Sequence, residues 1–253
     1  ATLADGGVED APLAADGPVQ DAPLAPDAAD AALTETRRVL FIGNSYTYYN
    51  DLPAVVRALG AASGVLVEAE VIAPGAATFC DHSDNIETRG RIASGEHDAV
   101  VFQGQSVDMF YGGKDAYYCA QSLGLAARDA GARITWFATW ARRDGDEFYA
   151  RGRGVTTPAE MTNFVEGWYQ NVARWSGAGG HVARVGRAWE RTLAMRPGVV
   201  LHADDGSHPT PAGTLVAACA VTQSLIGRVP EMPSPPPFGL DADLAAMLCD
   251  LGT

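Results

Sequence analysis

Short apolar runs alternate with stretches of helical spacing along the chain from Arg37 onward. The apolar runs have the length of buried strands, and most of them end next to glycine, proline or a polar residue. We predict strands at Val39–Ile42, Val65–Ile72, Ala99–Phe102 and Arg133–Ala138, and a weaker strand at His181–Val185.

The stretches between these runs are typical of helices; in the first of them, Val55, Val56 and Leu59 would share one face. Strands separated by helices indicate a parallel sheet that is covered on both faces, so the expected fold class is a three-layer α/β/α sandwich. Ligands bind at the carboxyl ends of the strands in such sheets. We predict helices at Leu52–Ala62, Ala116–Ala130, Pro158–Trp175, Ala188–Met195, Pro211–Ile226 and Asp241–Leu248.

Residues 1–36 differ from the rest of the chain in composition. They contain eight acidic side chains, no Lys or Arg and no aromatic residue, and Asp-Ala-Pro-Leu-Ala occurs at Asp10 and again at Asp21. Such a segment has too little apolar surface to offset the entropy of ordering it. We predict a disordered acidic tether before one folded domain at 37–253, in a chain that is secreted or tethered to an envelope. A dispensable tail is the alternative.

The net charge of -13 is concentrated at that end of the chain. The remaining 217 residues hold 23 acidic and 18 basic side chains, a net charge of -5. Phosphate backbones are bound by basic faces, so we expect no nucleic-acid partner. No run of 18 apolar residues is present, so we expect no transmembrane segment. The first residue is Ala1, which suits a processed or truncated chain.

The sequence lacks the common signatures of metal and nucleotide sites. It has no His-Glu-x-x-His, no Cys-x-x-Cys and no acidic loop of EF-hand spacing. The phrase that begins at Gly112 lacks the upstream glycine and the following Ser or Thr of a Walker motif. We therefore expect neither a metal ion nor another cofactor.

Two short phrases carry candidate chemistry. Gly43-Asn44-Ser45 stands at the end of the first predicted strand, and Asp205-Gly206-Ser207-His208 lies far downstream. A serine hydroxyl is weakly nucleophilic until a base takes its proton, and a histidine base acts best when a carboxylate orients it. The two phrases supply all three groups and predict a serine hydrolase. A helix N-cap is the structural alternative for the serine.

The order of these blocks resembles the SGNH hydrolase superfamily, also called GDSL-type esterases. The similarity runs from Arg38 to about Ile226, and it includes an isolated glycine after the second strand and a Gln-Gly phrase after the third. The resemblance implies a flavodoxin-like α/β/α fold and an activity on ester bonds.

The resemblance also implies a role for each member of the catalytic set. Ser45 would be the nucleophile, His208 the general base and then acid, and Asp205 the carboxylate that orients the histidine. Asp204 is the neighbouring rival for the last role. His82 lies after the second strand and could also approach the site.

An oxyanion hole is implied as well, built from the backbone N–H groups of Ser45 and Gly75 and from a side-chain amide. Many relatives carry Gly-x-Asn-Asp after the third strand, whereas this chain has Gln103-Gly104-Gln105-Ser106. That phrase resembles the Gln-Gly-Glu-Ser of sialate and acetylxylan O-acetylesterases, in which Gln is the amide donor. Gln103 is the first candidate because it stands at the strand end, and Gln105 is the second.

Aromatic residues follow several predicted strand ends. We expect Tyr46, Tyr111 and Trp140 to contact the substrate, because an aromatic face suits stacking on sugar rings. Ordinary helix packing is the alternative for the tyrosines. Arg142 and Arg143, which follow the fourth strand, could shape the pocket or could pair with nearby acids.

The four cysteines permit two disulfides, which would suit an exported chain. Cys80 and Cys119 follow the second and third strands and converge on the same end of the sheet, while Cys219 and Cys249 lie on the two C-terminal helices. We predict the pairs Cys80–Cys119 and Cys219–Cys249. Four buried free thiols are the alternative.

Together these features predict an exported serine esterase that hydrolyses short-chain acyl esters. Acetyl esters of carbohydrate are the favoured substrate, because of the Gln-Gly resemblance and the tyrosines. Two alternatives stay open: a general carboxylesterase or lipase acting on lipid or aryl esters, and a carbohydrate-binding module on an inactive esterase scaffold.

Overall fold

The computed structural model describes residues 35–253 and contains a five-stranded parallel sheet. The strands lie in the order β2-β1-β3-β4-β5. The inner strand β3 and the second half of β1 are buried on both faces, which explains why they read as continuous apolar runs. The strand bounds are β1 Glu35–Ile42, β2 Val65–Ile72, β3 Ala99–Phe102, β4 Arg133–Phe137 and β5 His181–Ala183.

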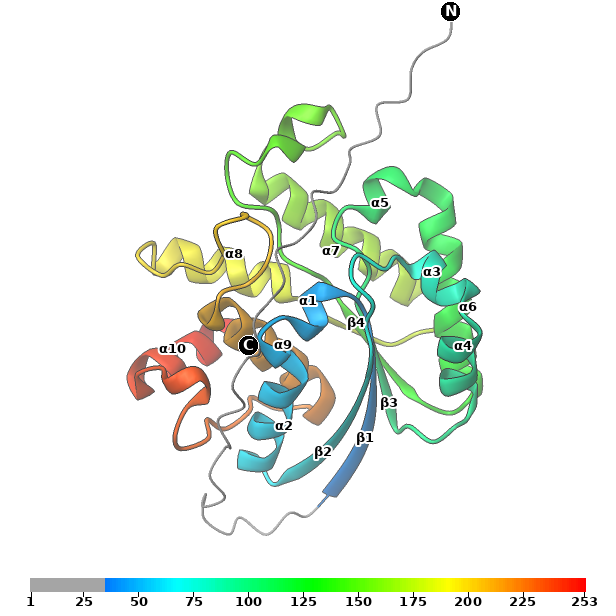
Figure 1. The fold of residues 1–253 in the computed structure, drawn as a ribbon, viewed down its shortest axis with the longest axis horizontal. Coiled ribbons are helices and arrows are strands. Elements are labelled where there is room, and N and C mark those ends of the chain that lie inside the picture. Colours follow the sequence, from blue (N-terminus) through cyan, green and yellow to red (C-terminus); the bar gives the residue numbers. More distant parts are fainter. Residues whose placement is uncertain (1–34) are drawn as a thin grey trace, which may run out of the picture.

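Helices cover both faces of this sheet and confirm the predicted three-layer fold (Figure 1). Helices α2, α8, α9 and α10 pack on one face, and α3, α4, α6 and α7 pack on the other. No helix of residues 35–253 is long and apolar enough to cross a membrane. The helix bounds are α1 Ser45–Tyr48, α2 Leu52–Ala62, α3 Phe79–Asp84, α4 Ile86–Ala93, α5 Asp108–Tyr111, α6 Gly113–Asp129, α7 Pro158–Trp175, α8 Val185–Met195, α9 Pro211–Ile226 and α10 Ala242–Gly252.

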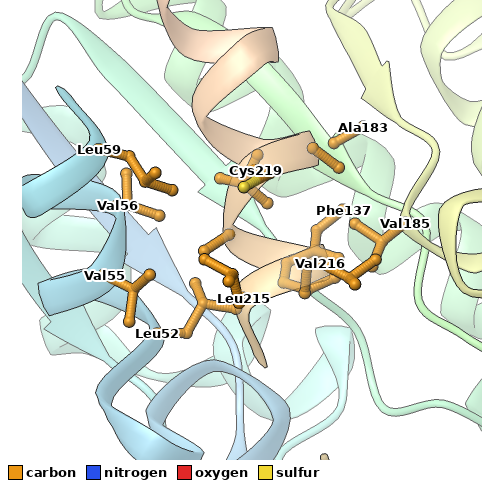
Figure 2. Packing of buried hydrophobic residues seen from close by; sticks show 14 of the residues in the cluster. Leu52, Val55, Val56, Leu59, Phe137, Ala183, Val185, Leu215, Val216 and Cys219 are labelled. Carbon is orange, nitrogen blue, oxygen red and sulfur yellow. The ribbon is translucent and has the colours of Figure 1, made fainter. Parts of the chain in front are cut away.

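Each face of the sheet has its own hydrophobic core. Figure 2 shows part of the first core, where Leu52 and Leu59 of α2 face Leu215 and Cys219 of α9. Helix α9 is buried on almost all sides because α2, α8 and α10 surround it. This burial explains why α9 is apolar around its whole circumference instead of along one stripe.

Five predicted elements have the observed bounds: α2, β2, β3, α7 and α9. The prediction is wrong at the join between β5 and α8. The strand stops at Ala183, and the helix begins at Val185, three residues before the predicted Ala188. Val185 is fully buried as the first residue of the packed helix face, so its apolar side chain belongs to α8 and not to the strand.

Three short helices, α3, α4 and α5, lie where no helix is predicted. Side-chain caps stabilise the first two: Thr78 and Asp81 form a capping box at the start of α3, and Asn85 caps α4. Because these helices have few apolar positions, their hydrophobic periodicity is too short to recognise.

The tether predicted at 1–36 lies outside the described residues except for its last two positions. Glu35 and Thr36 begin β1, so this strand starts four residues before the predicted Val39. The added residues pair with Val65–Glu68 of β2 in parallel register. Their side chains are mostly exposed, so this part of the strand is held by backbone hydrogen bonds and shows no apolar run in the sequence.

Two disulfides are present, and they join the pairs expected from the sequence. Cys80–Cys119 ties α3 to α6 with Cα atoms 5.0 Å apart, and Cys219–Cys249 ties α9 to α10 with Cα atoms 5.3 Å apart. Both separations are normal for a disulfide. The first bond is the more relevant to function, because α3 lies against the end of β1 where Ser45 is found.

Candidate active site

Strand β1 delivers Ser45 to the carboxyl end of the sheet. The chain leaves the strand through Gly43 and Asn44, and Asn44 caps α1 by accepting a backbone N–H bond of 3.1 Å. The turn requires glycine at position 43, because a Cβ there would lie 2.1 Å from Thr47 Oγ1 and 2.7 Å from Gln103 Oε1. The place of Ser45, the first residue of α1, is therefore fixed by side chains packed behind the turn.

Gln103 is one of these side chains, and it is completely buried. Its Oε1 accepts hydrogen bonds from the Asn44 N–H and the Thr47 hydroxyl, both at 2.9 Å, and its Nε2 donates to the Gly104 carbonyl at 2.5 Å. Both polar atoms of the amide are thus used inside the protein. The prediction that Gln103 points its nitrogen into an oxyanion hole is wrong; Gln103 instead supports the turn that carries Ser45.

Gln105, the second predicted amide donor, is only half-buried. Its Oε1 accepts a hydrogen bond of 2.6 Å from the Val107 N–H, whereas its Nε2 makes no hydrogen bond to any residue of 35–253. The bond to Val107 orients the amide and leaves its NH₂ group for a ligand. Gln105 is therefore the amide that stays available after β3.

His82 also supports the turn, although the sequence gives little sign of this. Its Nε2 donates to the Gly43 carbonyl over 2.7 Å, and its Nδ1 faces Thr88 Oγ1 at 3.5 Å. A carbonyl oxygen can only accept, so Nε2 carries the ring proton. Burial lowers the pKa of His82, although the bond to Gly43 opposes the shift. His82 is thus a neutral, buried hydrogen-bond donor beneath the turn.

The downstream loop brings His208 to Ser45. His208 Nε2 lies 2.9 Å from Ser45 Oγ, and His208 Nδ1 lies 2.5 Å from Asp205 Oδ2. The other carboxylate oxygen, Oδ1, accepts the backbone N–H groups of Ser207 and His208, each at 2.9 Å. Asp204 makes no such contact with the histidine; only its backbone carbonyl accepts a side-chain hydrogen bond. Serine, histidine and aspartate therefore form one chain of hydrogen bonds.

The environment of Asp205 keeps its carboxylate ionised. Partial burial favours the neutral form, but hydrogen bonds from the His208 ring and from the Ser207 and His208 N–H groups outweigh it and lower the pKa of Asp205. An ionised Asp205 accepts the proton on His208 Nδ1. The other ring nitrogen, Nε2, is then free to accept the Ser45 proton.

Tyr46 and Trp140, both predicted to bind substrate, are buried instead, with exposed fractions of 4% and 0%. Their rings stack with centroids 4.4 Å apart, and Trp140 stacks in turn on Trp189 at 4.3 Å. Tyr46 Oη lies 2.7 Å from Ser207 Oγ, and Trp140 Nε1 donates to the Ser207 carbonyl at 2.9 Å. Neither ring has a face left for a ligand. The two residues hold the loop that carries His208.

The exposed aromatic rings near Ser45 are those of Tyr48, the last residue of α1, and of Tyr49, the residue after it. Tyr49 stacks on His208 with ring centroids 4.6 Å apart. Tyr48 Oη would lie 3.6 Å from a Cβ at Gly75, and Asn44 Nδ2 donates to the Ala77 carbonyl at 2.9 Å. The loop after β2, which contains Gly75, therefore lies against the turn that carries Ser45.

Tyr111, the third predicted substrate contact, is exposed on α5. The guanidinium of Arg153 lies 4.1 Å from the centre of its ring, and Phe148 packs against its edge. These contacts belong to the surface around α5, and none of them involves Ser45, His208 or Asp205.

A second buried histidine, His202, lies just before the loop that carries Asp205 and His208. Its Nε2 donates to the Ala141 carbonyl at 2.9 Å, and burial lowers its pKa. Neither His82 nor His202 belongs to a metal site: no group of three or more His, Cys, Asp and Glu side chains within 35–253 could hold a metal ion.

The free energy of unfolding should fall as the pH decreases below about 6.5, because burial lowers the pKa of His82 and of His202, which are neutral when folded and protonate on unfolding. The unfolded chain binds more protons in this window, so stability rises with pH, by at most about 1.4 kcal/mol per pH unit for each histidine. Urea unfolding at each pH measures the slope. His82→Gln or His202→Gln should reduce it, whereas His181→Gln, at an exposed position, should leave it unchanged. Equal slopes in all three variants would contradict the prediction.

Comparison with protein-family models and with curated proteins gives no match. Solved structures do match. A candidate SGNH hydrolase from Slackia heliotrinireducens aligns with a TM-score of 0.63 and 27% identity, over 75% of this chain and 99% of its own. A DUF4886 family protein from Bacteroides uniformis aligns with a TM-score of 0.70 and 18% identity, over 86% and 93% of the two chains. A catalytic mutant of an acetylxylan esterase from Geobacillus stearothermophilus aligns with a TM-score of 0.56 and 16% identity, over 75% and 94%.

These matches extend the resemblance from a few motifs to most of the folded chain. The chain has the α/β/α fold of the SGNH hydrolases and is similar to them in sequence and in structure. This similarity indicates an enzyme that hydrolyses ester bonds.

Proposed function

We propose that this protein is a serine esterase in which Ser45, His208 and Asp205 form the catalytic triad. The contact of 2.9 Å between His208 Nε2 and Ser45 Oγ carries the proposal, because it is within reach for proton transfer. An inactive scaffold that only binds carbohydrate would not need these three groups in line. The esterase is therefore favoured over the binding module.

Each step of the reaction uses a group described above. Ser45 Oγ attacks the ester carbonyl carbon, and its proton passes to His208 Nε2. The negative charge that develops on the carbonyl oxygen is stabilised by the N–H groups of Ser45 and Gly75 and by the Gln105 amide. The bond to the alcohol then breaks, and His208 returns the proton to the departing oxygen. Water then attacks the acyl-enzyme carbonyl, with His208 again taking and returning the proton, and the acid is released as Ser45 is restored.

The two glutamines after β3 should respond differently to substitution. Gln105→Ala should lower kcat by roughly 10²–10³-fold with little change in KM, because its hydrogen bond strengthens mainly in the transition state. Gln103→Ala should instead lower the melting temperature, because the Asn44 N–H and the Thr47 hydroxyl would be left buried without a partner. Steady-state kinetics and thermal unfolding of both variants separate the roles. A stable Gln103→Ala enzyme with a selective loss of kcat would contradict this assignment.

The polar lining of a groove at Gly75 favours a short acyl chain. The groove has a volume of about 380 Å³, and its lining residues, none of which belongs to the proposed triad, are Pro74, Gly75, Ala76, Ala77, Asp81, His82 and Asn85. A long lipid chain would favour an apolar lining, whereas Asp81, His82 and Asn85 are polar. The function that the site supports best is therefore a carboxylesterase acting on short-chain esters.

Acetylated carbohydrate is the second candidate substrate, and the structural similarity to an acetylxylan esterase supports it. The Gln-Gly phrase gives this candidate no support, because Gln103 is buried behind the nucleophile turn.

Hydrolysis of nitrophenyl acetate, butyrate and octanoate, measured beside acetate release from acetylated xylan, tests both candidates. We expect kcat/KM to be lower for the octanoate ester than for the butyrate ester. Acetate release from xylan that exceeds hydrolysis of the nitrophenyl esters would favour the second candidate. If none of the esters is hydrolysed, the proposed function is wrong.

An extracytoplasmic location is part of the proposal. The two disulfides support it, because such bonds persist in oxidising compartments.

A further inference from the structure

Arg142 differs from the other arginines of the folded chain in its surroundings. Four arginines within 35–253 are half-buried: Arg37, Arg91, Arg142 and Arg187. Arg37, Arg91 and Arg187 each contact a carboxylate. Arg142 forms no ion pair with any residue in this part of the chain, and its buried Nε has no hydrogen-bond partner there. Its one side-chain hydrogen bond is a long one, 3.4 Å from Nη2 to Ser106 Oγ.

The position of Arg142 puts its guanidinium beside the loop that carries Gln105, the proposed amide donor. Its backbone follows β4, two residues after Trp140, which holds the loop of His208. Its side chain reaches back toward β3 and contacts Ser106, the residue directly after Gln105. In the sheet, β3 lies between β4 and β1, so this contact brings the Arg142 side chain onto the loop that follows the strand next to β1.

The neighbouring arginine has a different role. Arg143 donates its backbone N–H to the Gly206 carbonyl at 2.9 Å and its Nη2 to the Asp204 carbonyl at 3.0 Å. These bonds hold the loop that carries His208. Of the two arginines that follow β4, one is thus used by the fold, and Arg142 is left with an unpaired charge.

Part of the Arg142 guanidinium is buried without a partner, which is unfavourable, and an anion that binds it with good geometry can offset this cost. The guanidinium presents paired N–H donors that match the two oxygens of a carboxylate. The folded domain is itself mildly acidic, so an anionic substrate would gain no general attraction to it and would depend on a local cation.

We propose that Arg142 binds a carboxylate carried by the substrate, so that the enzyme prefers esters with a negative charge close to the scissile bond. The inference rests on the proposed esterase activity, and it names the class of substrate: short esters of dicarboxylic acids, or acyl esters of alcohols that bear a carboxylate.

Two matched pairs of esters test the proposal. Mono-4-nitrophenyl succinate against 4-nitrophenyl butyrate places the charge on the acyl side, and 4-acetoxybenzoate against its methyl ester places it on the alcohol side. In the native enzyme one anionic ester should have a KM about 10–100-fold below that of its neutral partner, as expected for hydrogen bonds to a charged group. Added NaCl should reduce the preference.

Arg142→Gln should remove this preference by raising the KM of the anionic ester. The kcat of the anionic ester, and both kcat and KM of the neutral ester, should stay the same. Arg142→Lys should keep part of it. The control is Arg191→Gln, which removes the same charge from an exposed position on α8 and should leave the preference intact. If Arg142→Gln does not fold, the salt-sensitive preference of the native enzyme and the Lys variant decide the matter.

The outcomes separate the two proposals. Hydrolysis of neutral esters with no preference for either anionic ester would overturn the carboxylate site, while the proposed esterase activity would still be supported. An equal loss on anionic and neutral esters in Arg142→Gln would also overturn it, because Arg142 would then only support the β3 loop through Ser106. If no ester is hydrolysed, the proposed esterase activity is wrong, and the proposed carboxylate site at Arg142 is wrong as well.

Discussion

Ser45→Ala should lower kcat for every ester by about 10⁴-fold or more, since the acyl-enzyme can no longer form. Ser45 Oγ lies 2.9 Å from His208 Nε2 and is the one hydroxyl in contact with that nitrogen within 35–253. The fold should be unaffected, because Asn44 and not Ser45 caps α1. Kinetics with nitrophenyl acetate give the loss, and thermal unfolding provides the control for folding.

The proposed triad should act as a unit, so the second substitution in it should add little. His208→Ala should cause a similar loss, and the double variant Ser45→Ala/His208→Ala should be no less active than either single variant. A phosphonate reagent should label the native enzyme at Ser45 and should fail to label the Ser45→Ala variant. Labelling at a different serine, or strong residual activity in Ser45→Ala, would show that the nucleophile has been assigned wrongly.

The parallel sheet and the contact among Ser45, His208 and Asp205 could be predicted from the sequence because each depends on local signals. Apolar runs such as Ala99–Phe102 mark the buried strands, and glycine-bounded turns mark their ends. Asp205 and His208 are three residues apart, so one tight loop brings them together without help from distant contacts. Ser45 stands at the carboxyl edge of the sheet, and the contacts of Ser207 with Tyr46 and Trp140 hold the loop beside it.

The errors at the site concern side-chain direction, which sequence position does not determine. Gln103 stands at a strand end, but its amide turns inward because Asn44 and Thr47 offer a donor each. Tyr46 and Trp140 are similar: both lie near the loop of His208, but Tyr46 stacks on Trp140, and Trp140 stacks in turn on Trp189, a residue far along the chain. Such a stack is visible only when the tertiary structure is known.

The largest omission is the buried support of the nucleophile turn. His82 has no motif around it, and the contact of its Nε2 with the Gly43 carbonyl joins residues 39 positions apart. The only signals near it are a capping box at Thr78 and the disulfide at Cys80, which together fix α3. These indicate an ordered segment but give no information about what its histidine contacts.

Asp205→Asn should lower kcat by about 10³–10⁴-fold, the second largest loss that we expect. The asparagine Oδ1 can still accept the N–H groups of Ser207 and His208, so the loop should keep its shape. The amide nitrogen, however, replaces Oδ2 beside His208 Nδ1 and donates a hydrogen bond to it. The ring must then carry its proton on Nε2, which faces Ser45 and can no longer accept the serine proton.

Asp204→Asn is the matched control for this variant. It removes the same charge one residue away, but its side chain makes no hydrogen bond within 35–253 and only its carbonyl is used, by Arg143. It should therefore keep nearly full activity. If the two variants lose activity equally, the effect comes from the general charge of the loop, and if Asp204→Asn alone is inactive, the orienting carboxylate is Asp204. Only a loss confined to Asp205→Asn, in a protein of unchanged thermal stability, fits a carboxylate that acts by selecting the histidine tautomer.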